Sequence, residues 1–274
     1  MRFADLHLHT NASDGTYTPE EVVLKSKYAG LSAISIVDHD TVDALDSALE
    51  VAKESEIEII PGIELSAACD GKEIHILGYL IDHRNQDLTE KIKILKNNRI
   101  DRVHKITEKL KDLGVNLKPQ TVFDIAGNGI ISRLHIARAL VQEKAVATTG
   151  EAFQRYIGDS SPAYVLGFKM KPEETISLIK NAGGIPVLAH PYSLHSDALT
   201  LKLIEFGIMG LEVYYPEHSQ GMINFYLDLA KKYNLLATGG SDCHGAAKPE
   251  VRIGSIKIPY TLIEELKKAK ETLL

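Results

Sequence analysis

The residues with the clearest capacity for chemistry are histidines and acids that stand near the ends of apolar runs. His7 and His9 alternate with leucines, so on a strand both imidazoles would project from one face and could bind one ion. Other histidines and acids follow later apolar runs in the same way. The candidate metal ligands are His7, His9, Asp14, His39, Glu64, His75, His190, Asp242 and His244.

A metal centre must be weighed against ordinary packing. A single histidine is more often a hydrogen-bonded core or loop residue than a ligand. Six histidines and three carboxylates would be costly to bury without partners, however, and divalent ions would supply a partner to each of them. Mixed imidazole and carboxylate ligation favours Mn²⁺, Zn²⁺ or Fe²⁺ over Mg²⁺ and Ca²⁺, which prefer oxygen alone. Cys243, between Asp242 and His244, should point away from both and pack.

Strands and helices must bring these positions together. Apolar runs that alternate with helical patterns predict βα units around a parallel sheet, with strands at 3–8, 32–38, 57–65, 184–190, 210–215 and 235–242. The run at 72–81 predicts a further strand, joined to the third as a hairpin through Asp70-Gly71. Thr18-Pro19 and Lys171-Pro172, each followed by acids, predict helix starts. In a βα barrel the carboxyl ends of the strands meet at one mouth, so the candidate ligands should meet there.

The middle of the chain has a different character. Residues 85–164 contain no convincing strand pattern, and helical patterns occur at 88–114, 119–127, 132–142 and 149–158. We therefore expect an all-helical insert at 85–164. Residues 1–84 and 165–274 should form one barrel-like domain.

Bulk composition limits the function classes. A chain of 274 residues can form one large α/β domain with a small insert. A net charge of −6 gives no general attraction to long duplex nucleic acid or to anionic membranes, so a polyanionic substrate must be held locally. The chain has two cysteines, and it shows neither a basic segment followed by an apolar one at its start nor a long apolar run. These features predict a cytoplasmic protein without a membrane segment. The oligomeric state stays open.

Six short motifs carry a family resemblance. In chain order they are DLHLHT with SDG, VDHD, GIEL, HILGY, AHP and GGSDCHG. Together they resemble the polymerase and histidinol phosphatase (PHP) superfamily of metal-dependent phosphoesterases over nearly the whole chain. The stretches SRLHIARALV and EAFQRYIGDSSPAYV are similar to the stand-alone branch that includes 3′,5′-nucleoside bisphosphate phosphatase and the 5′-to-3′ exoribonuclease called RNase AM.

The resemblance implies a distorted (β/α)7 barrel that holds three divalent ions. Carried onto this chain, it assigns the first ion to His7, His9, Glu64 and Asp242. Glu64 would bridge to a second ion held by His75 and His190, and the third ion would belong to Asp14, His39 and His244. Adjacent ions suit phosphate ester hydrolysis because they neutralise phosphoryl oxygens, activate water and stabilise the departing alkoxide. Glu64 and Asp242 would therefore be catalytic through the ions they hold.

The resemblance places the 85–164 insert over the metals as a substrate cap, so residues that select the substrate are expected there. Arg133 and His135, at the start of the 132–142 helix, could hold a second phosphate over the barrel mouth and act beside the reacting group. Arg99 and Arg102 are weaker candidates for substrate binding. Many relatives carry an arginine shortly after the His-Pro pair, whereas this chain has Tyr192, Ser193 and Leu194 there, so part of the phosphate-binding set would be either missing or replaced by His195 or Tyr192.

The predicted function is hydrolysis of a phosphate ester of a nucleotide by metal-activated hydroxide. A 3′,5′-nucleoside bisphosphate and the 5′ end of a short RNA both fit, since both present phosphates at similar spacing. A histidinol-phosphatase-like or amidohydrolase-like enzyme is an alternative, although the latter does not require Asp14, His39 and His244 as a third ligand set. A non-catalytic metal-binding accessory module is a further alternative, against which the full ligand set argues.

Overall fold

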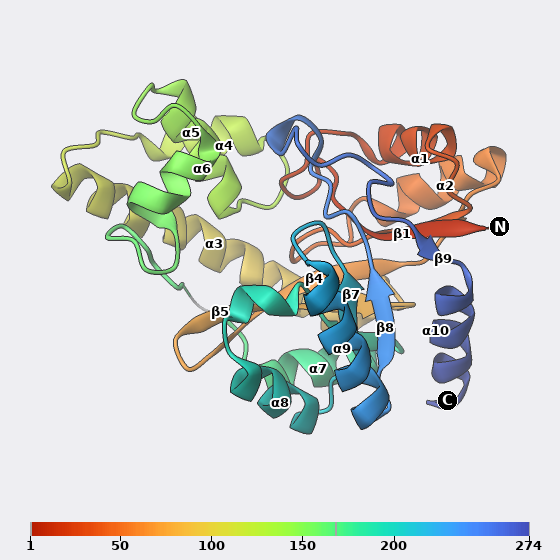
Figure 1. Ribbon diagram of the computed structural model, residues 1–274. Coiled ribbons are helices and arrows are strands. Elements are labelled where there is room, and N and C mark those ends of the chain that lie inside the picture. The colour runs from red at the N-terminus through yellow and green to blue at the C-terminus, as the bar shows by residue number, and fades with distance from the viewer. Residues whose placement is uncertain (1, 168, 274) are drawn as a thin grey trace.

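The strands of the protein form two sheets that face a common centre. The computed structural model describes residues 2–167 and 169–273. The first sheet has the order β3 (Glu58–Ile59), β2 (Ala33–Ile36), β1 (Phe3–Leu8) and β9 (Ile258–Pro259). The second has the order β4 (Gly62–Cys69), β5 (Lys72–Tyr79), β6 (Ile185–Leu188), β7 (Gly210–Tyr214) and β8 (Leu236–Gly239). The fold is thus mixed α/β, as the sequence predicts (Figure 1).

The two sheets approach each other at two seams. Leu8 pairs with Cys243, and His39 pairs with Glu64, each as an isolated parallel bridge. Within the described residues the ladder is interrupted at these seams, so the strands do not close into one continuous barrel sheet. The bridges lie beside candidate ligands, which places both sheets at the candidate site.

Two strand predictions need correction. The run at 57–65 is not one strand but divides into β3 and β4, because Pro61 has no N–H to continue a ladder. Gly62 follows where the chain passes close to β2, and a Cβ there would lie 2.5 Å from Ser35 Oγ. The short strand β9 was not predicted, and with two residues it has no readable period.

The hairpin prediction is confirmed. β4 and β5 pair antiparallel from Gly62 with Tyr79 to Cys69 with Lys72. Asp70 and Gly71 form the turn with φ of 52° and 79°, the left-handed region that a tight hairpin turn requires. Because the hairpin reverses the chain, β5 also runs antiparallel to β6. The sheet is therefore not all parallel, and His75 lies within a strand rather than at its end.

Helices pack against both faces of the sheets. They are α1 (Pro19–Tyr28), α2 (Leu45–Ser55), α7 (Pro172–Asn181), α8 (Asp197–Glu205), α9 (Gln220–Tyr233) and α10 (Thr261–Glu271). The predicted start of α1 is confirmed by a capping box between Thr18 and Glu21. On β5, Ile74 and Ile76 pack in the main core, which includes Ile179 of α7, whereas Leu77 and Tyr79, on the same face as His75, pack with Ile263 of α10. The side chain of Cys243 packs in the main core, as alternation predicts.

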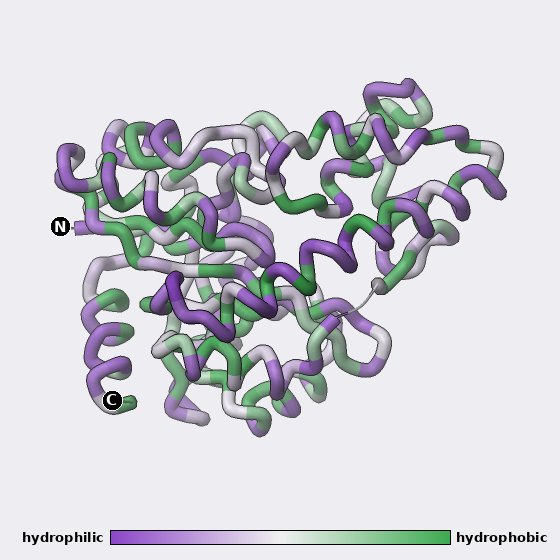
Figure 2. The backbone as a smooth tube through the Cα atoms, turned by 180° about the vertical axis from the view of Figure 1, so that it is seen from behind, coloured by the Kyte–Doolittle hydropathy of each residue, from purple (hydrophilic) through white to green (hydrophobic). Residues whose placement is uncertain are grey.

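The segment between β5 and α7 is helical. It contains α3 (Gln86–Asp112), α4 (Pro119–Ala126), α5 (Arg133–Gln142), α6 (Thr149–Ala152) and the π-helical turn η1 (Phe153–Ile157), which gather on one side of the sheets (Figure 1). The segment has an apolar core of its own that includes Val103, Ile106 and Leu110 of α3. Leu88 and Ile92, from the first turns of α3, pack in the main core instead. A single long helix, whose polar and apolar positions alternate in Figure 2, therefore ties the two cores together.

A helix that crosses a bilayer must be both long and apolar. No helix in the described part of the chain combines the length and the apolar character that crossing a bilayer would demand.

Candidate active site

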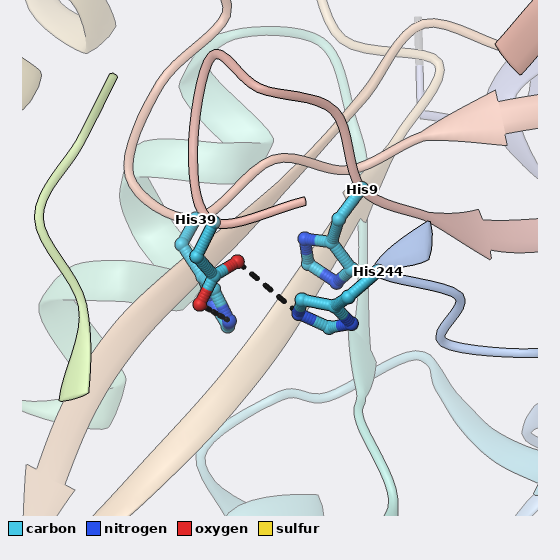
Figure 3. Close-up of side chains that lie close together, drawn as sticks. His9, His39 and His244 are labelled. Carbon is cyan, nitrogen blue, oxygen red and sulfur yellow. Dashed lines mark ion pairs between the residues drawn. The ribbon is translucent and has the colours of Figure 1, made fainter. Parts of the chain in front are cut away.

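The nine predicted ligands lie together in the structure. They come from β1 and the loop after it, the segment after β2, strands β4 and β5, and the segments after β6 and β8. His9, Asp14, His39 and His244 each offer a ligand atom within 4.8 Å of the others. Two more groups of this kind overlap with the first: His7, His9 and Asp242, and His39, Glu64 and His75. Figure 3 shows His9 and His244 side by side, with His39 across from them.

Glu64 occupies the centre of this cluster. It is fully buried on β4, and each of its carboxylate oxygens faces a different set of imidazoles. Oε1 lies 2.9 Å from His75 Nδ1 and 3.2 Å from His190 Nε2. Oε2 lies 3.3 Å from Nε2 of His7 and of His9 and 3.2 Å from His39 Nδ1. One carboxylate thus joins the ligand groups, which is the position that a bridging ligand would need.

The chemistry of these side chains fits divalent cations. Nδ1 of His9, His39 and His75 and Oδ1 of Asp14 are buried and make no hydrogen bond of normal geometry, although all but His9 Nδ1 have an oppositely charged or polar atom within 3.2 Å. A buried polar atom without a hydrogen bond costs about 1–3 kcal/mol, so several such atoms around one centre favour a bound ion as their partner. Imidazole nitrogens and carboxylate oxygens in this mixture suit Zn²⁺, Mn²⁺ or Fe²⁺.

The pKa values of the cluster's three carboxylates lie below their usual range. Burial alone would raise the pKa of Glu64, but the neighbouring His39, His75 and His7 hold it well below its usual range. Burial lowers the pKa of His39 to about 3. Burial opposes protonation of His9 as well, yet the carboxylates of Asp242 and Glu64 raise its pKa to about 9. Carboxylates likewise raise the pKa of His7 and of His75, so protons on these imidazoles balance the carboxylates, and divalent cations could take the place of those protons.

Glu212 contacts two of the predicted ligands, and its role was not predicted from the sequence. It is fully buried on β7, where its Oε1 lies 2.7 Å from His7 Nδ1 and its Oε2 accepts a hydrogen bond from the backbone N–H of His190 at 2.8 Å. A carboxylate on one imidazole nitrogen fixes the ring and leaves the other nitrogen free to bind an ion. The available signal was an acid inside the apolar run GLEVYY.

Asp242 is held by two residues that sequence patterns did not reveal. Tyr215 donates its hydroxyl to Asp242 Oδ2 at 2.8 Å, and Lys248 Nζ lies 2.9 Å from the same oxygen. The other oxygen, Oδ1, lies 3.1 Å from His9 Nε2. One side of the carboxylate is therefore anchored while the other faces the cluster.

A small cationic pocket adjoins the cluster. It has a volume of about 130 Å³, and its lining includes Arg99, Arg102 and Arg133 together with the predicted ligands Asp14, His39, His75 and His244. Arg99 donates from Nε to Asp40 at 2.8 Å, so its charge is largely balanced. Arg102 and Arg133 instead approach Glu73, whose other oxygen lies 3.1 Å from Lys169 Nζ. Burial lowers the pKa of Lys169 to about 8.

A larger cavity of about 550 Å³ lies on the other side of the cluster. Its lining includes Glu64, His190 and Asp242, and the aromatic side chains of Phe153, Tyr192 and Tyr215. The two cavities share these lining residues: His39, His75, Phe153, His244 and Lys248. The candidate ligands therefore lie where a cationic pocket meets an aromatic one.

Two predicted substrate contacts are placed differently from the arginines. His135 is buried near the start of α5, where its Nδ1 accepts a hydrogen bond from the backbone N–H of Ser132 at 3.1 Å. Burial lowers its pKa to about 4, so the ring is neutral and serves as a helix cap in this structure. His195 is exposed after Leu194, whereas Tyr192 and Ser193 line the larger cavity. Of the two proposed replacements for the family arginine, only Tyr192 reaches the site.

Comparison with known proteins gives one consistent result. The model of the PHP domain family matches residues 5–236. A 5′-3′ exoribonuclease of Haemophilus influenzae is 33% identical over 248 residues, 88% of this chain and 89% of the relative. A 3′,5′-nucleoside bisphosphate phosphatase of Chromobacterium violaceum is 30% identical over 254 residues, 89% of this chain and 88% of the relative. A solved structure from Bifidobacterium adolescentis, assigned to the metal-dependent phosphoesterases, has a TM-score of 0.88 and 29% identity, covering 96% of this chain and 94% of that one.

Proposed function

Because the chain belongs to the PHP domain family and is a phosphoesterase, we propose that it hydrolyses a phosphate ester of a nucleotide that carries a second phosphate. The substrate would be a 3′,5′-nucleoside bisphosphate or the 5′ end of a short RNA. The observation that carries this proposal is the cationic pocket beside the candidate ligand cluster. A reacting phosphate and a second phosphate would each have a place in one site.

We assign the reacting phosphate to the ligand cluster. Three ions would be held here. The first would be bound by His7, His9, Glu64 and Asp242, the second by Glu64, His75 and His190, and the third by Asp14, His39 and His244. Divalent ions bound there would supply Lewis acidity toward the phosphoryl group. Glu212, Tyr215 and Lys248 would keep the ligands in place.

We assign the second phosphate to Arg102 and Arg133. In the buried part of this region Arg102, Arg133 and Lys169 face the single carboxylate of Glu73, which leaves an excess of positive charge that suits a phosphate dianion. Arg133 also pairs with Asp159, whose side chain is 56% exposed and is therefore screened by water. Guanidinium groups bind phosphate oxygens through directed pairs of N–H donors, which favours them for this position.

The larger cavity would receive the nucleoside or the rest of the chain. Phe153 and Tyr192 offer aromatic surface on which a base can stack without regard to sequence. Histidinol phosphate has one phosphate and would leave the cationic pocket empty, and an amide substrate has none. These features support the nucleotide hypothesis over both alternatives.

The proposal extends to the architecture and the location. The two sheets with their helices would correspond to the distorted (β/α)7 barrel of the family, and residues 85–164 would be its substrate cap, since α5 and η1 bring Arg133 and Phe153 to the cavities. Cys69 and Cys243 are both free thiols, which is consistent with the reducing cytoplasm.

A panel of substrates tests the proposed function. Phosphate release would be measured from adenosine 3′,5′-bisphosphate, histidinol phosphate and an aryl phosphate, and nucleotide release from a short 5′-phosphorylated RNA, with and without Mn²⁺. We expect Mn²⁺-dependent turnover that is fastest on the bisphosphate or the RNA. Preference for histidinol phosphate would refute the nucleotide assignment, and absence of turnover on every substrate would favour the accessory-module alternative.

A further inference from the structure

Glu73 stands between the two halves of the site. It precedes His75 by two positions on β5, so both side chains project from the same face of the strand. Its side chain is only 6% exposed. Oε1 lies 3.4 Å from His75 Nε2 and 3.1 Å from Lys169 Nζ. Oε2 lies 2.9 Å from Arg102 Nη2 and 3.5 Å from Arg133 Nη2. One carboxylate therefore contacts a candidate ligand and the cations of the adjoining pocket.

The second nitrogen of His75 faces the cluster. His75 Nδ1 lies 2.9 Å from Glu64 Oε1, so the imidazole is placed between two carboxylates. His7 is placed in the same way between Glu212 and Glu64. Glu212, however, contacts only groups of the cluster side, whereas Glu73 also holds Arg102 and Arg133. Of these two carboxylates, Glu73 is the one that lines the cationic pocket.

We propose that Glu73 is a positioning residue that couples the candidate metal cluster to the cationic pocket. The same carboxylate orients the His75 ring toward the cluster and fixes the guanidinium groups of Arg102 and Arg133 in the direction of the pocket. The part that concerns phosphate rests on the proposed function. Loss of a residue that hydrogen-bonds a metal-binding histidine typically lowers metal affinity by about 10- to 100-fold. Loss of Glu73 should therefore weaken both metal binding and phosphate binding.

A charge-balancing role and a positioning role of Glu73 predict opposite changes in phosphate affinity when the residue is substituted. Removing the negative charge of Glu73 makes the pocket more positive, so a role in charge balance alone predicts tighter binding of phosphate. A positioning role predicts weaker binding, because the arginines lose the contact that fixes them. Glu73→Gln keeps the length and removes the charge, whereas Glu73→Asp keeps the charge and shortens the reach.

Asp159 offers a matched control. It contacts the same Arg133 through Nη1 at 2.5 Å, but it lies on the exposed side of that arginine. Asp159→Asn therefore removes one negative charge beside Arg133 while leaving His75 and its partners untouched.

The experiment measures Mn²⁺ affinity by titration calorimetry and the stabilisation of the metal-free protein by inorganic phosphate from its melting temperature. In both Glu73 variants we expect about a tenfold loss of Mn²⁺ affinity and a smaller phosphate-induced shift than in the unaltered protein. Asp159→Asn should keep the Mn²⁺ affinity and bind phosphate equally or more tightly. In active protein, the KM for a bisphosphate should rise in the Glu73 variants more than the KM for an aryl phosphate.

Three results would overturn the coupling. Unchanged Mn²⁺ affinity in both Glu73 variants would remove the link to His75. Tighter phosphate binding in Glu73→Gln would assign Glu73 to charge balance alone. Equal behaviour of Glu73→Gln and Asp159→Asn would show that position does not matter. If the unaltered protein does not hydrolyse bisphosphates, the proposed function fails, but the two binding measurements still decide the role of Glu73.

Discussion

The two halves of the candidate site are built in different ways. The ligand cluster is formed by short side chains on strands and on the segments that follow them, so the backbone of two sheets sets their positions. The cationic pocket is lined by long side chains of the helical segment, Arg99 and Arg102 of α3 and Arg133 of α5, of which Arg99 pairs with Asp40 and the other two contact Glu73 of β5. The geometry of the cluster therefore depends on the sheets, whereas that of the pocket depends on the ion pairs that hold these arginines to Asp40 and Glu73.

The largest effect is expected at the centre of the cluster. Glu64→Gln should abolish turnover and lower the metal content, because this carboxylate faces five imidazoles from its two oxygens. Turnover and bound metal, the latter by elemental analysis, would be measured on the same preparation. A circular dichroism spectrum like that of the unaltered protein is the control for folding. Near-normal activity with unchanged metal content would contradict the bridging position of Glu64.

The next largest effect is expected from a substitution in the cationic pocket that leaves the ligand cluster intact. Arg133→Ala should lower kcat/KM for a bisphosphate by about 30- to 150-fold, equivalent to about 2–3 kcal/mol for a charged contact with a phosphate. Hydrolysis of a simple aryl phosphate should stay nearly intact, since binding energy from a remote phosphate helps only substrates that have one. Steady-state kinetics on both substrates provides the test. Equal losses would place Arg133 at the reacting phosphate.

A smaller effect isolates the support behind His7. Glu212→Gln should weaken metal binding by about 10- to 100-fold, because the carboxylate no longer orients the ring. The binding of inorganic phosphate to the metal-free protein should not change, since Glu212 has no contact with the arginines of the pocket. Metal titration and phosphate-dependent melting would be compared. A loss of phosphate binding in this variant would show that the two halves are not separable.

The smallest effect concerns His135. His135→Ala removes a helix cap, so the free energy of unfolding should fall by about 1 kcal/mol. The value of kcat/KM for a bisphosphate should change by less than about threefold, because the ring faces the backbone of Ser132. Denaturant unfolding and steady-state kinetics give the two numbers. A large loss of kcat/KM with normal stability would restore the role in substrate binding that the sequence suggested.

The sequence predicted the cluster better than the pocket. Alternation on β1 and acids or histidines after apolar runs are local signals, and they named all nine residues that the structure brings together. Glu73, Lys169 and Lys248 had no such signal, because a charged residue beside a strand or helix is usually solvated and only tertiary packing gives it a partner. For the same reason the sequence indicated Arg99 and Arg102 only as weaker candidates for substrate binding.

The fold shows the same limit. The βα alternation, the hairpin turn and the helical middle segment followed from short-range patterns. The division of the strands into two sheets did not, although Pro61 was a readable sign that the 57–65 run would break. How two sheets meet at Leu8 with Cys243 and at His39 with Glu64 depends on pairings between distant segments, which local periodicity does not encode.

One measurement tests the central claim, that a cationic pocket beside the ligand cluster selects substrates with a second phosphate. The kcat/KM of the unaltered, Mn²⁺-loaded protein would be compared on adenosine 3′,5′-bisphosphate and adenosine 3′-monophosphate, which differ only in that phosphate. We expect a preference for the bisphosphate of at least about 30-fold, the value of one charged contact. Equal rates on the two substrates would contradict it.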